Sequence, residues 1–141
     1  MQIQYAATGA EIPDARALRN WAQAALTDDA EVTLRIVGRR EGRRLNRAFR
    51  GRDYATNVLT FVYDDRRPLH GDVVLCAPVV RAEAGRGAGK LEAHYAHLVV
   101  HGMLHLQGFD HEQPRQAQFM ELLESEIVTR LGYPDPYATL A

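Results

Sequence analysis

The segment HGMLHLQGFDH, residues 101–111, places three histidines within eleven residues. His101 and His105 are four residues apart, so on a helix they lie about 6 Å apart along the axis and project from the same face. Gly108 lets the chain reverse direction, because glycine adopts a positive φ without steric cost. Such a reversal can return His111 to the face that carries the other two rings. The spacing therefore predicts that His101, His105 and His111 bind one metal ion.

Three imidazole nitrogens suit zinc, and they leave the fourth tetrahedral position open, which is typical of catalytic rather than structural sites. Zinc lowers the pKa of a bound water to about 7 and polarises carbonyl or phosphoryl oxygens. We therefore expect one Zn²⁺ ion, hydrolytic chemistry, and a catalytic role for His105. His97 lies about 12 Å from His105 along the helix axis, too far to share the ion, so we expect it outside the ligand set, supporting the ligands or the pocket.

Peptides and nucleic-acid phosphodiesters are the two substrate classes that such a centre could hydrolyse. The histidine spacing is that of metzincin proteases, but their motif has a glutamate base directly after the first histidine, where this chain has Gly102. Asp110 could replace that base, or it could orient a histidine ring by accepting its second N–H. The missing glutamate argues against a zinc peptidase, which stays the first alternative.

A phosphodiester needs positive charge beside its nonbridging oxygens. The segment RREGRRLNRAFRGR, residues 39–52, holds seven arginines and a single acid, Glu41. Arg50 is the best candidate for a bidentate phosphate contact, because it follows Phe49, expected with Leu45 and Ala48 to anchor a helix, and precedes a turn. A solvated arginine-rich helix would give the same pattern. The other candidate substrate-binding residues are Arg47, Arg52 and Asn57.

The elements that must position these residues follow from the apolar patterns. Strands are expected over residues 1–7, 30–38, 56–64 and 71–80. Helices are expected over residues 13–26, between 39 and the turn at 51, and over 79–85, 91–107 and 114–131. This order predicts an α+β fold, with one domain over residues 1–141 and a small mixed sheet of about four strands packed against about five helices.

The composition narrows the setting. A single cysteine, Cys76, excludes an intramolecular disulfide, and the N-terminal residues lack the pattern of a secretory signal. The longest apolar runs are well short of the roughly 20 residues of a membrane-spanning helix. We therefore expect a cytoplasmic protein that acts as a monomer, without a membrane partner.

Three stretches, residues 45–61, 70–80 and 97–111, resemble the YbeY-type endoribonucleases, also called rRNA maturation factors, and the region of Met120 and Glu124 extends the likeness. This chain departs from the family pattern at three positions. Ala55 stands where proline is usual, Thr60 where serine is usual, and His70 where an apolar residue is usual.

The resemblance implies a zinc ion on the three histidines and a functional arginine at Arg50. It also implies cleavage of single-stranded RNA in rRNA precursors, including the 3′ end of 16S rRNA, in ribosome quality control and in contact with the small ribosomal subunit. The nucleophile is either a metal-activated water or a ribose hydroxyl, and the sequence leaves both open. The second alternative is a ribosome assembly factor without catalysis, in which zinc only stabilises the fold.

Overall fold

The computed structural model describes residues 1–9, 11–63, 68–88, 90–110 and 112–138. Within them the elements follow the order β1 (Gln2–Tyr5), α1 (Ala15–Ala24), β2 (Ala30–Val37), α2 (Arg39–Arg50), β3 (Val58–Val62), β4 (Leu69–Cys76), α3 (Ala77–Glu83), a π-helical turn η1 (Ala84–Ala88), α4 (Leu91–Leu106) and α5 (Pro114–Arg130). This order confirms the predicted α+β fold.

The four strands form one mixed sheet in the order β1-β2-β4-β3. β2 pairs in parallel with both β1 and β4, while β3 pairs antiparallel to β4 and forms one edge of the sheet. Val32, Leu34 and Ile36 alternate along β2 and are buried, as the period of two predicts. β3 and β4, which follow one another in the sequence, are therefore also neighbours in the sheet.

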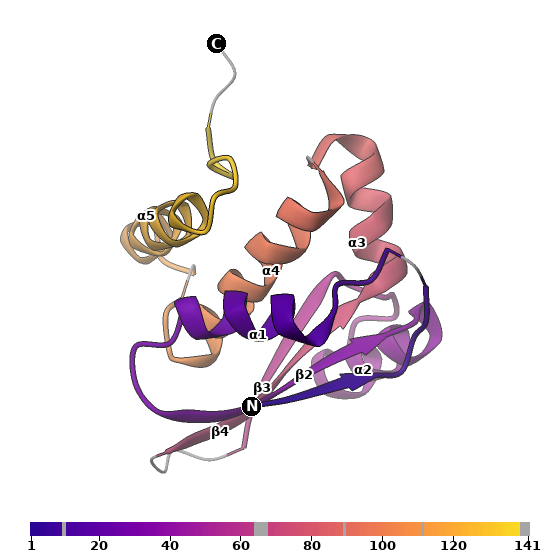
Figure 1. The fold of residues 1–141 in the computed structure, drawn as a ribbon. Helices are drawn as coiled ribbons and strands as arrows, with labels where there is room; N and C mark the ends of the chain where they lie inside the picture. Colours follow the sequence, from indigo (N-terminus) through magenta and orange to yellow (C-terminus); the bar gives the residue numbers. More distant parts are fainter. Residues whose placement is uncertain (10, 64–67, 89, 111, 139–141) are drawn as a thin grey trace.

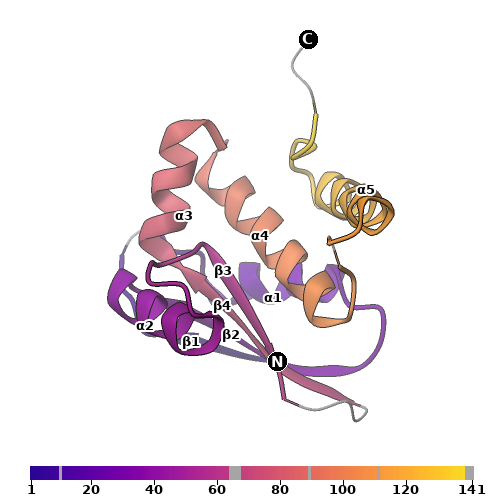
Figure 2. The same ribbon diagram turned by 180° about the vertical axis from the view of Figure 1, so that it is seen from behind.

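The helices cover both faces of the sheet (Figures 1 and 2). One face packs against α1 and α4 and forms the main core, and α5 packs on the outer side of α4. α2 packs against the other face, where Leu45 contacts a smaller cluster of buried residues that includes Leu59, Val74 and Cys76. None of the helices within the described residues is both long and apolar enough to cross a membrane.

The structure corrects how α2 is anchored. Phe49 was expected to hold the helix on the core, but its side chain is 67% exposed. Its ring meets Phe61 of β3 edge-on, with centroids 5.1 Å apart. Because β3 is the edge strand, a ring that packs on it stays largely exposed. The buried residues of α2 are instead Gly42 and Asn46.

Two element boundaries also differ from the prediction. The fourth strand ends at Cys76 rather than running through residue 80, and α3 begins at Ala77. Pro78 lies in the first turn of α3, where its missing N–H leaves no hydrogen bond unmade. α1 begins at Ala15 rather than residue 13, because the Asp14 side chain caps it by accepting a hydrogen bond from Ala17 N.

Candidate metal centre

His101 and His105 lie on successive turns of α4, and their rings stack with centroids 6.4 Å apart and planes at 17°. The predicted shared face is therefore confirmed. His111, the third predicted ligand, lies outside the described residues. Within the described part of the chain no group of three or more histidine, cysteine or acidic side chains is arranged to hold a metal ion. The complete three-histidine centre therefore stays a prediction.

Gly108 adopts the conformation that the spacing demands, with φ at +101°. Its N–H donates to His105 O at 3.1 Å, and Phe109 N–H donates to Leu104 O at 3.1 Å, so the carbonyls of the last turn of α4 are satisfied. The Phe109 ring then lies against Phe119 of α5, with centroids 6.1 Å apart. The chain therefore leaves the axis of α4 soon after Leu106, as a return of residue 111 to the histidine face requires.

Each histidine has a polar partner at Nδ1. His105 Nδ1 lies 2.8 Å from the Thr60 hydroxyl of β3, and His101 Nδ1 lies 3.1 Å from Glu124 Oε1 of α5. With Nδ1 engaged, each ring would have to bind a metal through Nε2. Metal-binding histidines in proteins are held in this way, by an outer acceptor that fixes the ring and its tautomer. The donor chemistry of these two residues therefore fits zinc.

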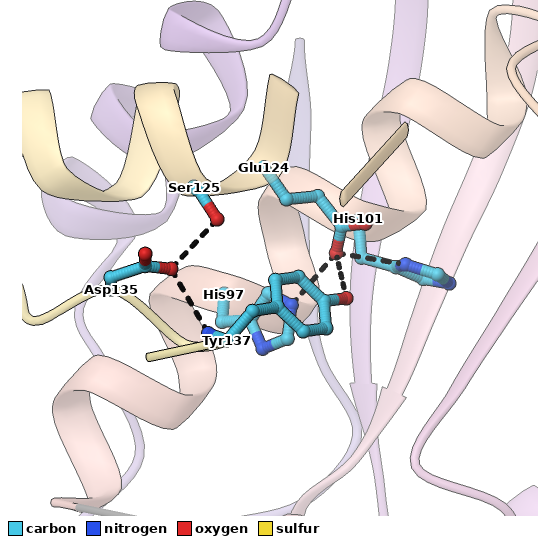
Figure 3. A network of polar contacts seen from close by, with 6 residues as sticks. All are labelled: His97, His101, Glu124, Ser125, Asp135 and Tyr137. Atoms are coloured by element: carbon cyan, nitrogen blue, oxygen red, sulfur yellow. Dashed lines mark hydrogen bonds and ion pairs between the residues drawn. The ribbon is translucent and has the colours of Figure 1, made fainter. Parts of the chain in front are cut away.

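Glu124 is the acceptor at the centre of a buried polar network (Figure 3). Its side chain is 1% exposed, and Oε1 lies 2.7 Å from His97 Nε2 as well as 3.1 Å from His101 Nδ1. Burial by itself raises the pKa of Glu124, but the hydrogen bonds of His101 and His97 outweigh it and hold the pKa at about 2. His97 thus contacts Glu124, the partner of His101. A supporting role outside the ligand set, as expected for His97, would need such a contact.

Gly102 lies at a close contact between α4 and the sheet. A Cβ at this position would be 2.8 Å from Val73 Cγ1 and 3.2 Å from Val58 Cγ2. Any side chain at this position would force Val73 or its surroundings to shift. The glutamate of the protease motif is therefore absent from a tightly packed position. The same close approach puts Thr60 of β3 against His105.

Arg50 is the last residue of α2, and Gly51 follows it with φ at +68°. Because α2 and α4 cover opposite faces of the sheet, the sheet separates the backbone of Arg50 from the two histidines. The neighbouring Phe49 contacts the edge strand β3, so the guanidinium would have to reach the histidine face around that edge. The structure places Arg50 near the β3 edge of the sheet, but it shows no contact between Arg50 and the two histidines.

The other predicted substrate-binding residues differ in their partners. Arg47 and Arg52 are exposed near the end of α2, and the side chain of Arg52, like that of Arg50, makes no hydrogen bond or ion pair with any described residue. Asn57 is engaged, because its amide donates to Glu83 Oε1 at 3.1 Å and Oε2 at 3.2 Å. Glu83 Oε1 also lies 2.9 Å from His94 Nε2 of α4. An RNA contact by Asn57 would have to replace these bonds and stays a prediction.

Asp110 accepts a hydrogen bond from Glu112 N at 3.3 Å. Its predicted role beside a histidine ring stays a prediction. His70, one of the departures from the family pattern, is half exposed and lies 3.2 Å from Glu31.

The contacts of Thr60 and Glu124 with the histidines did not follow from the sequence. Met120, Glu124 and Val128 are the buried residues of α5, and they repeat every four residues. An acid in the middle of an apolar helical stripe is a signal that it has a buried partner. For Thr60, the only signal was that threonine keeps a hydroxyl at a position where serine is usual.

Known proteins are similar to this chain over most of its length. Residues 3–132 match the family model described as endoribonuclease YbeY. A relative in Aromatoleum aromaticum is 62% identical over 129 residues, which cover 92% of this chain and 84% of the relative. A relative in Nitrosomonas europaea is 59% identical over 137 residues, covering 97% of this chain and 84% of the relative. Both relatives carry the name endoribonuclease YbeY.

The fold also resembles a solved structure. A solution structure of a Thermotoga maritima protein, 24% identical in sequence, matches with a TM-score of 0.59 and covers 98% of this chain and 100% of its own. At this identity the likeness supports the fold alone.

Proposed function

The chain belongs to the YbeY endoribonuclease family, and from this premise we propose that it is a zinc-dependent enzyme that cuts single-stranded RNA. Family membership makes it a hydrolase of RNA phosphodiester bonds that acts in rRNA processing. The proposed role is maturation of the 3′ end of 16S rRNA and quality control of ribosomes, with the small ribosomal subunit as partner. We further propose that it works as a monomer in the cytoplasm.

One observation carries the zinc dependence. His101 and His105 stack on one face of α4, and each has its Nδ1 held by an outer partner, Glu124 or Thr60. This is how proteins prepare imidazoles to bind a metal through Nε2. His111, three residues past the positive-φ Gly108, would complete the ligand set.

The ligand residues and Arg50 divide the work of phosphodiester hydrolysis between them. A zinc ion held by His101, His105 and His111 would supply Lewis acidity toward a phosphoryl oxygen and toward the attacking hydroxyl. Thr60 and Glu124 keep the two described rings from rotating, so the charge of the bound ion would stay at one place. Arg50 would reach around the β3 edge and neutralise a nonbridging oxygen through two parallel N–H donors.

The two alternatives can be weighed on the structure. A peptidase of the metzincin kind needs a carboxylate base at position 102, where this chain has Gly102 and where a Cβ would lie only 2.8 Å from Val73 Cγ1. A zinc-stabilised assembly factor without catalysis would not need an exposed Arg50 at the sheet edge. We therefore favour the nuclease.

The test is cleavage of an rRNA precursor that carries the 3′ end of 16S rRNA, with casein as the peptidase substrate. We expect the zinc-loaded protein to cut the RNA and leave casein intact, and we expect chelation to stop the cut. A 2′,3′-cyclic phosphate on the product would identify the ribose hydroxyl as the nucleophile. Casein cleavage, or binding of ribosomal particles without any RNA cut, would support one of the alternatives instead.

A further inference from the structure

The C-terminal segment after α5 returns to the metal centre (Figure 3). We propose that Tyr137 is a positioning residue that holds the Glu124 carboxylate in place for His101, so that residues 135–137 act as a clasp on the outer side of the metal centre. The inference rests on the zinc binding in the proposed function. It goes beyond the family pattern, because the matched residues end at 132.

Tyr137 contacts both members of the network behind His101. Its phenol donates a hydrogen bond to Glu124 Oε1 at 3.1 Å. Its ring meets the His97 ring edge-on, with centroids 5.4 Å apart and planes at 84°. Burial and the Glu124 charge raise the pKa of the phenol, so it stays a donor at neutral pH. Glu124 Oε1 is thus shared by His97, His101 and Tyr137.

Asp135 ties the clasp to α5 beside Glu124. Its Oδ1 accepts from Ser125 Oγ at 2.7 Å and from Tyr137 N at 3.0 Å. Ser125 directly follows Glu124 in α5, so the backbone that carries Tyr137 is fixed to the residue next to the carboxylate. At the start of the segment, the Tyr133 ring packs edge-on against Trp21, with centroids 6.1 Å apart. The segment is therefore held at both ends of the turn.

The phenol has a physical task at Glu124. A glutamate side chain has several rotatable bonds, and each donor on its oxygen narrows the rotamers it can adopt. Tyr137 comes from a different segment than the two histidine donors, so it fixes the carboxylate from a third direction. Without the phenol hydroxyl, Oε1 loses one donor. The carboxylate can then leave His101 Nδ1, and the ring is no longer held with Nε2 toward the metal.

The test is the zinc affinity of Tyr137→Phe, measured by competition with a chromophoric chelator. Loss of an outer partner typically weakens metal binding by about 10- to 100-fold, and we expect a loss in this range. Asp135→Ala should act in the same direction, because it releases the backbone of Tyr137. The matched control is Tyr133→Phe. It removes a phenol hydroxyl from the same segment on the Trp21 side, and it should leave the zinc affinity unchanged.

A second readout separates positioning from a general loss of stability. Nitrogen-15 spectra of the metal-free protein report which ring nitrogen carries the proton. We expect His101 to be protonated at Nδ1 in the wild type and to show a larger share of the Nε2 tautomer in Tyr137→Phe. An unchanged zinc affinity, or a weakened affinity with an unchanged tautomer, would overturn the proposed role of Tyr137. If the wild type itself binds no zinc, the proposed function fails as well, so the two failures are distinguishable.

Discussion

At His105, a hydroxyl on the edge strand lies 2.8 Å from the ring nitrogen that does not face the predicted metal. Thr60 and Glu124 play matching parts for the two described histidines, although one is a neutral hydroxyl and the other a buried carboxylate. A neutral partner fixes the ring, whereas a charged partner also raises the basicity of the ligand. At the scale of single residues, the centre therefore depends on outer partners as much as on the histidines.

Replacing Thr60 by valine should weaken zinc binding. Valine keeps the shape of threonine but removes the oxygen that would accept from His105 Nδ1 when Nε2 binds zinc, so we expect the dissociation constant to rise by about tenfold or more. Thr60→Ser keeps the hydroxyl and should bind zinc as the wild type does. Chelator competition measures both. Equal affinities for the valine and serine variants would show that the hydroxyl does not hold the ring.

Arg50 should contribute to cleavage and not to folding. We expect Arg50→Ala to lower kcat/KM for single-stranded RNA by about 100-fold, the usual cost of removing one donor to a developing oxyanion. The melting temperature should stay unchanged, because the guanidinium has no partner among the described residues. Arg16→Ala on α1 is the control for a general loss of positive charge. If both variants cut RNA at the same rate, Arg50 is an ordinary surface cation.

At the scale of elements, the contact between α4 and the sheet decides where the histidines lie. Gly102 lets the helix approach Val73 and Val58, and the approach places His105 beside Thr60. The spacing of the histidines predicted α4 and the turn at Gly108 correctly, because both depend on residues close in sequence. The burial of Phe49 was predicted wrongly, because it depends on which strand forms the sheet edge. Sequence could not pair Glu124 with His97, since they lie on different helices.

Gly102→Ala tests this contact. Alanine favours a helix over glycine by about 1 kcal/mol, but overpacking a buried contact costs about 1–3 kcal/mol. With a Cβ only 2.8 Å from Val73 Cγ1, we expect the free energy of unfolding to fall. Gly85→Ala in η1 is the control, because no heavy atom lies within 4 Å of its added Cβ. Denaturant titration gives both values. A Gly102→Ala protein as stable as Gly85→Ala would mean that the helix does not need this approach.

At the scale of the whole molecule, the distribution of charge and the predicted metal decide how the protein would contact RNA. The net charge is -1, yet seven arginines gather in residues 39–52. One of them, Arg43, is neutralised by Asp53 at 2.8 Å. The remaining arginines form a local positive surface on and beside α2, on the side of the sheet away from α4. A strand of RNA that reaches the histidines from this surface would pass the β3 edge.

Metal removal should lower the stability of the whole fold. Zinc at a hundredfold excess over its dissociation constant stabilises the folded state by about 2.7 kcal/mol. For a chain of this size that corresponds to several degrees in Tm. Calorimetry with and without a chelator measures the shift, and His101→Ala should abolish it. A zinc-dependent shift of the same size in His101→Ala would place the metal elsewhere.

The most direct test of the account is single-turnover cleavage of an unstructured RNA by chelated, zinc-reconstituted and His105→Ala protein, with the zinc content measured in the same samples. The account predicts one zinc ion per chain and cleavage in the reconstituted wild type, and neither in His105→Ala. Cleavage at the wild-type rate by chelated protein, or by His105→Ala without zinc, would contradict it.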